Sequence, residues 1–399
     1  MAELDRKGSS IGNAELAQRF VQFVMVQVQN IYYVLGRIPS LDGLRAVSIT
    51  AVIGGHLAMS GNLPLGASGS AILERLPHFG VRVFFVISGF LITSLILEER
   101  ASTGEFSLSQ FYQRRAWRIL PPAYLLLSCL LIANLFHFIS ISSFDYLRAF
   151  AYLMNYGPIP NWFVGHLWSL SVEEQFYLIW PFLLAFLSVR SCRYIAVAFI
   201  FISAALRYHM ALNPPPDMWR HEYEFQYAGT AIAFGCLLAI DRDWLYSRKW
   251  FRAVCASYFT APAACALLLA NSILLRASGA LGLCIADIVT NLSILVLVAK
   301  FTCWPHGPIA VLLNARPVVF VGTISYSLYL WQQIFANSIP RLYSSWFPFN
   351  LLMIVLFALG SYYFVEQPSL KIRRRLHQRH GAGKGTVPPV VTAGQLGPE

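Results

Sequence analysis

The segment FGVRVFFVISGFLITSLILEE, residues 79–99, contains an apolar run at 80–97 that only Arg82 interrupts with a charge. A helix crosses the bilayer with about 17–25 mostly apolar residues, so this run is long enough for one span. Similar runs lie at about 44–60, 119–139, 167–187, 194–212, 225–240, 254–271, 281–299, 317–337 and 346–365. These runs predict an all-α, polytopic membrane helical bundle of about ten transmembrane helices, because a β-barrel would instead show short segments of alternating polarity.

Composition and charge support this fold class. Hydrophobic residues make up 57% of the 399-residue chain and charged residues 12%, against roughly 25% charged residues in soluble domains. The net charge of +11 is compatible with a nucleic-acid partner, but most lysines and arginines fall in the terminal segments and in alternate loops. By the positive-inside rule, this distribution places both termini in the cytoplasm. We therefore expect a multi-pass protein of the cytoplasmic (inner) membrane, with the lipid bilayer and not nucleic acid as its partner.

The ends of the chain differ from its apolar centre. We expect a cytoplasmic N-terminal segment at 1–37, a transmembrane domain at 38–375 and a disordered cytoplasmic tail at 376–399. Residues 16–36 are apolar but carry several Gln and Asn side chains, which favours an interfacial helix, with an additional span as the alternative. The seven cysteines are interpreted as small core residues, and no metal site or disulfide framework is predicted.

Arg45 and His56 are polar residues within one membrane-length segment. They are eleven positions apart, and eleven steps of about 100° end roughly 20° past three full turns, so both side chains face the same way, about 16 Å apart. A shared face suggests a lined cavity, because burying either side chain in lipid is unfavourable. The alternatives are that His56 bonds to a neighbouring helix and that Arg45 snorkels to the cytoplasmic interface.

Two adjacent carboxylates, Glu173 and Glu174, fall about two turns inside the predicted start of the span at 167–187. Adjacent residues point to different faces of a helix, so one of them can face a cavity while the other meets a partner. Because this span runs inward, both carboxylates lie near the predicted depth of His56. The alternative is that the span begins later and that both glutamates lie in an interfacial loop.

Three arginines, Arg114, Arg115 and Arg118, lie at the cytoplasmic start of the span at 119–139. They precede Pro121 and Pro122, which are expected to break or open the first turn of that span. Arginine recognises phosphate through bidentate hydrogen bonds, so the cluster suggests a phosphate clamp. Ordinary positive-inside anchoring explains the same arginines almost equally well.

The remaining polar and small residues of the spans are less specific. Arg82 lies at the outer edge of its span, where snorkelling is enough to explain it, and Gly80 and Gly89 permit tight helix contacts. Asp287, one turn before Asn291, is either a cavity residue or part of a helix-to-helix hydrogen bond. The serines and tyrosines at 324–333 are interpreted as packing contacts.

These placements predict a polar path from a cytoplasmic arginine cluster to a histidine and a carboxylate near the outer side. A phosphate-bearing donor would bind at the arginines, and the histidine would act on an acceptor from the other face. A transporter or flippase of a glycan or lipid-linked intermediate is the alternative, since embedded charges also line substrate paths. The sequence shows no internal repeat of the kind typical of transporters.

Six segments of this chain resemble the membrane-bound acyltransferase-3 family. They are IPSLDGLRAVSITAVIGGHL (38–57), FGVRVFFVISGFLITSLILEE (79–99), FYQRRAWRILPP (111–122), WSLSVEEQFYLIWP (168–181), SYSLYLWQQ (325–333) and YYFVEQP (362–368). The resemblance extends from about 38 to 375 and implies O-acylation, usually O-acetylation, of a carbohydrate such as exopolysaccharide, lipopolysaccharide or an oligosaccharide. It also implies cytoplasmic acyl-CoA, most often acetyl-CoA, as donor substrate with no bound cofactor, in a member of the stand-alone type.

Two motifs with basic residues carry much of the resemblance. The family's arginine–histidine motif falls on Arg45 and His56, and its paired arginines fall on Arg115 and Arg118. We expect His56 to act as general base on a sugar hydroxyl, with an acyl-histidine intermediate as the competing mechanism. Arg45 would hold donor phosphate or polarise the carbonyl. Arg115 and Arg118, with the neighbouring Arg114, would hold the phosphates of coenzyme A.

The family's serine-x-glutamate motif falls on Ser171 and Glu173. Glu173 would orient the imidazole of His56 and stabilise its charged form, as the acid of a catalytic triad does, and Ser171 is expected at the substrate. The chain departs from the family pattern at Arg82, where many relatives have aspartate. A basic residue there would suit binding of an acidic acceptor.

Overall fold

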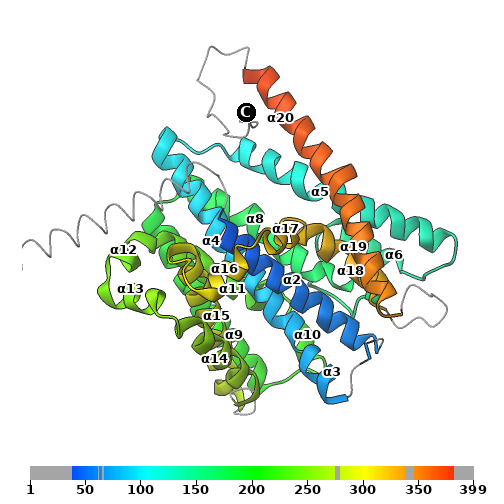
Figure 1. Cartoon of the computed structure of the whole chain (residues 1–399), viewed down its shortest axis with the longest axis horizontal. Helices are drawn as coiled ribbons and strands as arrows, with labels where there is room; N and C mark the ends of the chain where they lie inside the picture. The colour runs from blue at the N-terminus through cyan, green and yellow to red at the C-terminus, as the bar shows by residue number, and fades with distance from the viewer. Residues whose placement is uncertain (1–37, 62, 65–66, 275–278, 338–345, 382–399) are drawn as a thin grey trace, which may run out of the picture. The chain divides into compact units, whose positions relative to one another are not determined.

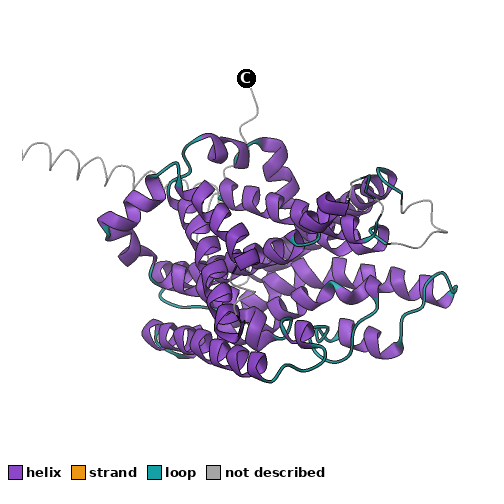
Figure 2. Ribbon diagram, turned by 90° about the horizontal axis from the view of Figure 1, so that it is seen from below, coloured by secondary structure: helices purple, strands orange, loops and turns teal. Residues whose placement is uncertain are grey.

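The computed structural model describes residues 38–61, 63–64, 67–274, 279–337 and 346–381, and the elements below belong to the compact unit Ser40–His380. Every regular element in these ranges is a helix (Figures 1 and 2), which confirms the all-α prediction. The first helices are α2 Pro39–Met59, α3 Ala67–Leu73, α4 Leu76–Thr103, α5 Leu108–Leu135, α6 Ser143–Phe150, α7 Trp162–Gly165, α8 Leu167–Phe186, α9 Val189–Leu212 and α10 Met218–His221. They are followed by α11 Phe225–Ile240, α12 Arg242–Ser247, α13 Lys249–Ala256, α14 Thr260–Leu274, α15 Gly279–Cys303, α16 Pro308–Leu313, α17 Arg316–Thr323, α18 Ser325–Phe335, α19 Phe349–Ser361, the π-helical turn η2 Tyr362–Glu366 and α20 Gln367–Gly381.

Several of these helices can cross a membrane, as expected for a multi-pass protein. Five segments in the described ranges are long and apolar enough to do so: Ser68–Thr103, Leu108–Leu135, Val189–Leu212, Gly279–Cys303 and Phe349–Leu376. Two bent pairs, α13 with α14 (85°) and α17 with α18 (70°), raise this number to seven. Helices α2, α8 and α11 cover the other three predicted runs. Each predicted run therefore lies on a helix or a bent helix pair, and the count of about ten spans stays a prediction.

The two ends of the predicted domain are only partly covered by the structure. The expected interfacial helix at 16–36 lies outside the described residues, as does the end of the predicted tail. Helix α20 continues to Gly381, so the first residues of the segment predicted as a disordered tail at 376–399 are helical.

Helix α5 differs from the expectation at its two prolines. It begins at Leu108 and continues through Pro121 and Pro122 to Leu135 without a break. A proline inside a helix removes one backbone N–H donor, and the turns on both sides of the pair keep their own backbone hydrogen bonds. The arginine cluster therefore lies on the wall of a continuous helix and not in a loop before it.

Small residues bring α4 close to its neighbours, as predicted for Gly80 and Gly89. A Cβ atom on Gly89 would lie 2.1 Å from the carbonyl oxygen of Ile232 on α11, and one on Gly80 would lie 2.6 Å from the carbonyl oxygen of Ser48 on α2. No side chain larger than hydrogen fits at either crossing. Helix α4 is thus held between α11 and α2, the helix that carries Arg45 and His56.

Candidate active site

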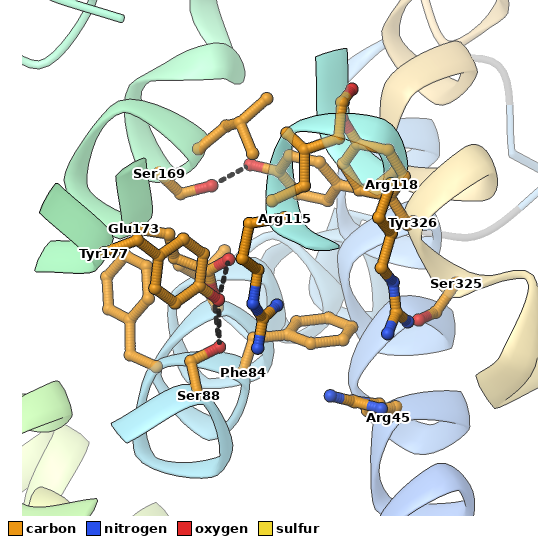
Figure 3. A pocket seen from close by; sticks show the side chains of 15 residues that line it. Arg45, Phe84, Ser88, Arg115, Arg118, Ser169, Glu173, Tyr177, Ser325 and Tyr326 are labelled. Atoms are coloured by element: carbon orange, nitrogen blue, oxygen red, sulfur yellow. Dashed lines mark hydrogen bonds between the residues drawn. The ribbon is translucent and has the colours of Figure 1, made fainter. Parts of the chain in front are cut away.

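Four predicted site residues line one cavity, which we call the arginine cavity. Arg45 comes from α2, Arg115 and Arg118 from α5, and Glu173 from α8. The cavity has a volume of about 100 Å³. Figure 3 shows the three guanidinium groups converging on the same space. Ser88, Ser169, Tyr177, Ser325, Tyr326 and Tyr329 contribute the other polar groups of its wall.

The guanidinium groups of this cavity have few partners within the protein. Arg45 Nη1 lies 3.3 Å from Asp42 Oδ1, and Arg115 lies over the ring of Tyr177, 4.6 Å from its centroid. Among the described residues, none forms a hydrogen bond or an ion pair with the guanidinium group of Arg115 or of Arg118. Their N–H donors can therefore bind an anion in the cavity.

Glu173 is the carboxylate of the arginine cavity. It accepts a hydrogen bond from Ser88 Oγ at 2.9 Å and another from Tyr177 Oη at 3.3 Å, as drawn in Figure 3. The cavity thus combines three cationic side chains with one carboxylate. This excess of positive charge suits a ligand with more than one negative charge, such as a phosphate ester.

Arg114 and Ser171 are two of the predicted site residues that do not line this cavity. Arg114 Nη2 forms an ion pair with Glu99 Oε2 at 2.7 Å, although its neighbour on α5 lines the cavity. Ser171 is fully buried, and its Oγ accepts from the backbone N–H of Met154 at 3.1 Å and donates to the carbonyl of Leu167 at 2.9 Å. Ser171 therefore joins the chain before α7 to helix α8.

His56 lines a second and larger cavity, of about 330 Å³, which we call the histidine cavity. Its wall is formed by parts of α2, α4, α7, α8, α10 and α18. Its lining residues include His166, Trp162, Trp168, Trp219, Arg220 and Tyr223. The wall is rich in aromatic rings, and it contains a second histidine that lies just before the motif WSLSVEE.

The hydrogen-bond partner of His56 is not the residue expected from the sequence. Its Nδ1 lies 2.7 Å from Oε1 of Gln332 on α18, whereas Glu173 lines the arginine cavity and bonds to Ser88 and Tyr177. The two residues predicted to act as a pair are thus held by different partners.

The two adjacent glutamines of α18 hold two of the three histidines that line the histidine cavity. Oε1 of Gln333 lies 2.7 Å from His166 Nδ1 and accepts a bond from the backbone N–H of His166 at 2.9 Å. His166 Nε2 lies 3.1 Å from the carbonyl oxygen of Leu330. Gln332, Gln333 and His166 were not among the site residues predicted from the sequence. Two consecutive amides inside an apolar span were the available signal, since a buried amide requires a hydrogen-bonding partner.

The arginine and histidine cavities adjoin each other. Val81 and Tyr329 line both of them. Tyr329 Oη lies 2.6 Å from Ser169 Oγ and donates to the carbonyl of His166 at 2.7 Å, so its side chain is fixed at the boundary. Helix α2 runs past both cavities and places Arg45 in the first and His56 in the second. The face predicted to be shared by these two residues thus lines two adjoining cavities.

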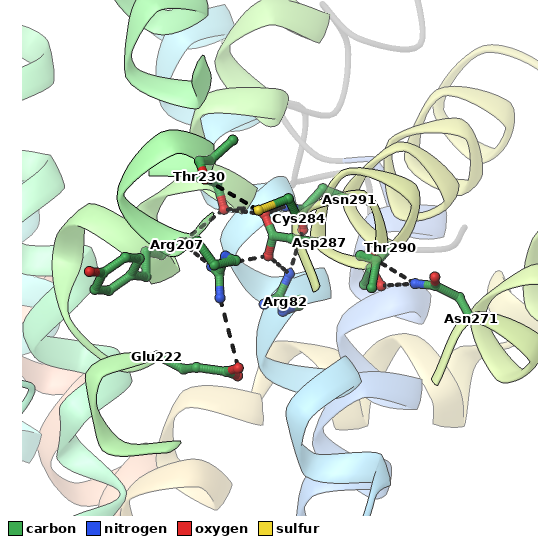
Figure 4. A network of polar contacts seen from close by, with 12 residues as sticks. Arg82, Arg207, Glu222, Thr230, Asn271, Cys284, Asp287, Thr290 and Asn291 are labelled. Atoms are coloured by element: carbon green, nitrogen blue, oxygen red, sulfur yellow. Dashed lines mark hydrogen bonds and ion pairs between the residues drawn. The ribbon is translucent and has the colours of Figure 1, made fainter. Parts of the chain in front are cut away.

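Arg82 lies in neither of these two cavities. Figure 4 shows it in a buried network in which Asp287 Oδ1 lies 2.5 Å from Arg82 Nη1 and 3.3 Å from Arg207 Nη2. The other oxygen, Oδ2, accepts hydrogen bonds from Thr230 and Asn291 at 3.1 and 3.2 Å. Of the two roles considered for Asp287, the structure places it in interhelical hydrogen bonds. This network therefore keeps Arg82 away from the predicted site residues that line the two cavities.

The described residues contain no cluster of side chains that could hold a metal ion. In the part of the chain that the structure describes, no group of three or more His, Cys, Asp or Glu side chains is arranged to hold a metal ion. The seven cysteines are free thiols.

The chain is similar to known proteins over the region that contains these motifs. Residues 38–366 match the acyltransferase-3 family, whose model is described as an acyltransferase domain. The chain is 29% identical over 328 residues to the peptidoglycan O-acetyltransferase of Listeria monocytogenes, covering 74% of this chain and 48% of that protein. It is 28% identical over 373 residues to a putative peptidoglycan O-acetyltransferase of Bacillus subtilis, covering 83% and 54%. A putative O-acetyltransferase of Staphylococcus aureus is 36% identical over 178 residues, covering 41% and 27%.

The extent of these matches defines what they establish. The chain spans about half the length of the first two relatives, and no solved structure matches it. The family match includes the helices that carry Arg45, His56, Arg115, Arg118 and Glu173. The chain belongs to the acyltransferase-3 family.

Proposed function

We propose that this protein is a membrane O-acetyltransferase that moves an acetyl group from cytoplasmic acetyl-CoA to a hydroxyl group of a carbohydrate on the other side of the membrane. Family membership and the names of its relatives support the reaction class. The observation that carries the proposal is the pair of adjoining cavities along α2, one with three arginines and one with His56. With the donor on the cytoplasmic side and the acceptor on the other side, both termini of the chain lie in the cytoplasm.

The arginine cavity is proposed as the donor site. Guanidinium groups bind phosphate oxygens through paired, charge-assisted hydrogen bonds, and Arg115 and Arg118 keep their donors available for such bonds. The cavity volume of about 100 Å³ is smaller than the roughly 300–1,000 Å³ of sites that enclose a whole ligand. The cavity therefore holds one part of the donor, while the rest extends toward the cytoplasm. Arg114, paired with Glu99, takes no part in this contact.

His56 is proposed as the general base. When its Nδ1 carries the proton and donates to Oε1 of Gln332, 2.7 Å away, the lone pair of Nε2 is free to accept a proton. Nε2 then takes the proton of the sugar hydroxyl while the hydroxyl oxygen forms a bond to the acetyl carbonyl carbon. The C–S bond of the thioester breaks, and the CoA thiolate leaves toward the arginine cavity. A base of this kind contributes about 10²–10⁴-fold to the rate.

Gln332 takes the orienting role that the sequence assigned to Glu173. A carboxylate next to His56 would stabilise the imidazolium more strongly than an amide does, but Glu173 bonds to Ser88 and Tyr177. We assign Glu173 to the arginine cavity, where it balances part of the charge of Arg115 and keeps Tyr177 in place beneath that guanidinium.

The test uses the full chain in nanodiscs with radiolabelled acetyl-CoA and a glycan fraction from the host. Transfer of label to glycan and release of CoA thiol are measured in parallel. The variants are His56→Ala and, as a matched control, His209→Ala, whose histidine is exposed on α9 and lines neither cavity. We expect the control to transfer label normally and His56→Ala to lose about 10²–10⁴-fold.

Two results would contradict the proposal. Equal transfer by His56→Ala and wild type would remove the base assignment. Absence of both glycan label and thiol release in the wild type, with acetyl-CoA and with succinyl-CoA, would exclude acyl transfer and favour the transporter alternative.

A further inference from the structure

Arg220 differs from the other deeply buried arginines of this protein. Four arginines in the described ranges are at most 9% exposed, and three of them have a carboxylate partner: Arg82 and Arg207 pair with Asp287, and Arg148 pairs with Asp145. Arg220 lines the histidine cavity, and none of the described residues forms a hydrogen bond or an ion pair with its guanidinium group. A buried cation without a counterion is unfavourable, so this guanidinium is prepared for an anion that enters the cavity.

The acidic residues near Arg220 are paired with other groups. Asp217 Oδ1 and Glu224 Oε1 lie 3.6 and 2.7 Å from the two ring nitrogens of His221. Glu222 Oε1 lies 3.8 Å from Arg207 Nη1. The carboxylates closest to Arg220 in sequence thus pair with Arg207 or His221. None of them neutralises the guanidinium group of Arg220.

Other titratable groups face the same cavity. His56, His78 and His166 line it, and Glu74 is the acidic side chain among its lining residues. Glu74 is exposed, so water screens its charge, whereas Arg220 is buried in the wall. An anion next to the guanidinium is therefore attracted more strongly than the exposed carboxylate repels it.

Aromatic rings form much of the remaining wall. Trp168 and Tyr223 are stacked with ring centroids 4.4 Å apart, and Trp219 meets Tyr223 edge-on at 6.0 Å. Trp162 meets His56 edge-on at 5.8 Å. Aromatic faces pack against the C–H face of a pyranose ring, since both are apolar and flat. The cavity volume of about 330 Å³ lies at the lower end of the roughly 300–1,000 Å³ typical of small-molecule sites.

We propose that the histidine cavity binds a carbohydrate acceptor that carries a negative charge, with Arg220 binding its carboxylate or phosphate group and the aromatic wall packing against its ring. This inference rests on the proposed acyl transfer, because it assigns the acceptor of the same site. His56 and Arg220 line one cavity, so an anion held by Arg220 fixes where the sugar lies and presents a hydroxyl to the base. Bidentate binding by arginine restricts orientation as well as position.

The experiment measures binding without any acyl donor. Glucose, glucuronic acid and glucose 6-phosphate are titrated into the full chain in nanodiscs, and tryptophan fluorescence reports Kd. We expect at least one charged sugar to bind about tenfold or more tightly than glucose, and its identity distinguishes carboxylate from phosphate. Arg220→Gln should remove this preference, and Arg220→Lys should keep part of it because the charge remains but the bidentate geometry is lost. The matched control is Arg75→Gln, which alters an exposed arginine near the same cavity and should keep the preference.

Equal affinity of the wild type for all three sugars would overturn the inference. So would a charge preference that persists in Arg220→Gln, since another cation would then bind the anion. A single size-exclusion peak for each variant establishes that it folds. Because no acetyl-CoA is present, failure of this binding test leaves the acyl-transfer proposal intact, and that proposal is tested separately by thiol release.

Discussion

The substitution Asp287→Asn tests whether the buried network between α4, α9 and α15 is structural. Asp287 is 9% exposed, and its carboxylate contacts two guanidinium groups, those of Arg82 at 2.5 Å and Arg207 at 3.3 Å. Asparagine keeps the shape and one acceptor oxygen but removes the charge. After the change, Arg82 keeps Asn291 Oδ1 at 3.2 Å. Arg207 keeps the carbonyl of Tyr227 at 3.3 Å and Glu222 Oε1 at 3.8 Å, so the uncompensated charge is chiefly that of Arg82.

The size of the effect follows from what remains. Removing one partner of a buried ion pair costs about 3–5 kcal/mol, because the remaining charge stays in a medium of low polarity. For a chain of 399 residues, each kcal/mol lowers the melting temperature by about 1.2 °C, which gives a shift of about 4–6 °C. The matched control is Asp243→Asn. Asp243 pairs with Arg242 at 3.4 Å, but its side chain is 89% exposed, so we expect about 0–1 kcal/mol.

The assay is thermal unfolding of the purified chain in one detergent, followed by the loss of the monodisperse size-exclusion peak after heating. The double variant Arg82→Gln/Asp287→Asn should be less destabilised than the sum of the two single variants, because the two groups form one interaction. Equal melting temperatures of Asp287→Asn and Asp243→Asn would refute the structural assignment. Arg82 would then be open again to the acceptor-binding role predicted from the sequence.

Three further predictions concern the site and the helix packing. Gln332→Leu should lower kcat for acetyl transfer by about 10–100-fold, as is typical for residues that orient a functional histidine. The KM for the donor should change little. An unchanged kcat would show that His56 needs no orienting amide. Arg118→Ala should chiefly raise the apparent KM for acetyl-CoA in the thiol-release assay, by about tenfold or more for a lost charge-assisted contact, and an unchanged KM would argue against the donor site. Gly89→Ala should reduce the amount of folded protein in membranes, because a Cβ atom there would lie 2.1 Å from the backbone of α11. The control is Gly54→Ala, which should match wild type because no atom lies within 4 Å of a Cβ at that position. Equal abundance of the two variants would contradict the packing of α4 against α11.

The local order of the chain was accessible from the sequence because it depends on short-range regularities. Apolar runs of membrane length predicted the helices, since a buried backbone must satisfy its own hydrogen bonds. The 3.6-residue period placed Arg45 and His56 on one face of α2, and each of them lines one of two adjoining cavities. The charges inside the apolar spans and the family motifs both indicated Arg115, Arg118 and Glu173 as candidate site residues.

The partners of these residues were decided by tertiary structure. His56 bonds to Gln332, 276 positions away in the sequence, and Arg82 to Asp287, 205 positions away. Whether a buried polar side chain is a ligand or a structural partner depends on which helices cross beside it, and those crossings are set by close contacts such as that of Gly89 with α11. A single chain position carries no record of such long-range contacts. The sequence by itself therefore determined which helices form and which of their faces are polar, and only the packing of the helices decided which polar groups neutralise one another and which remain free for a substrate.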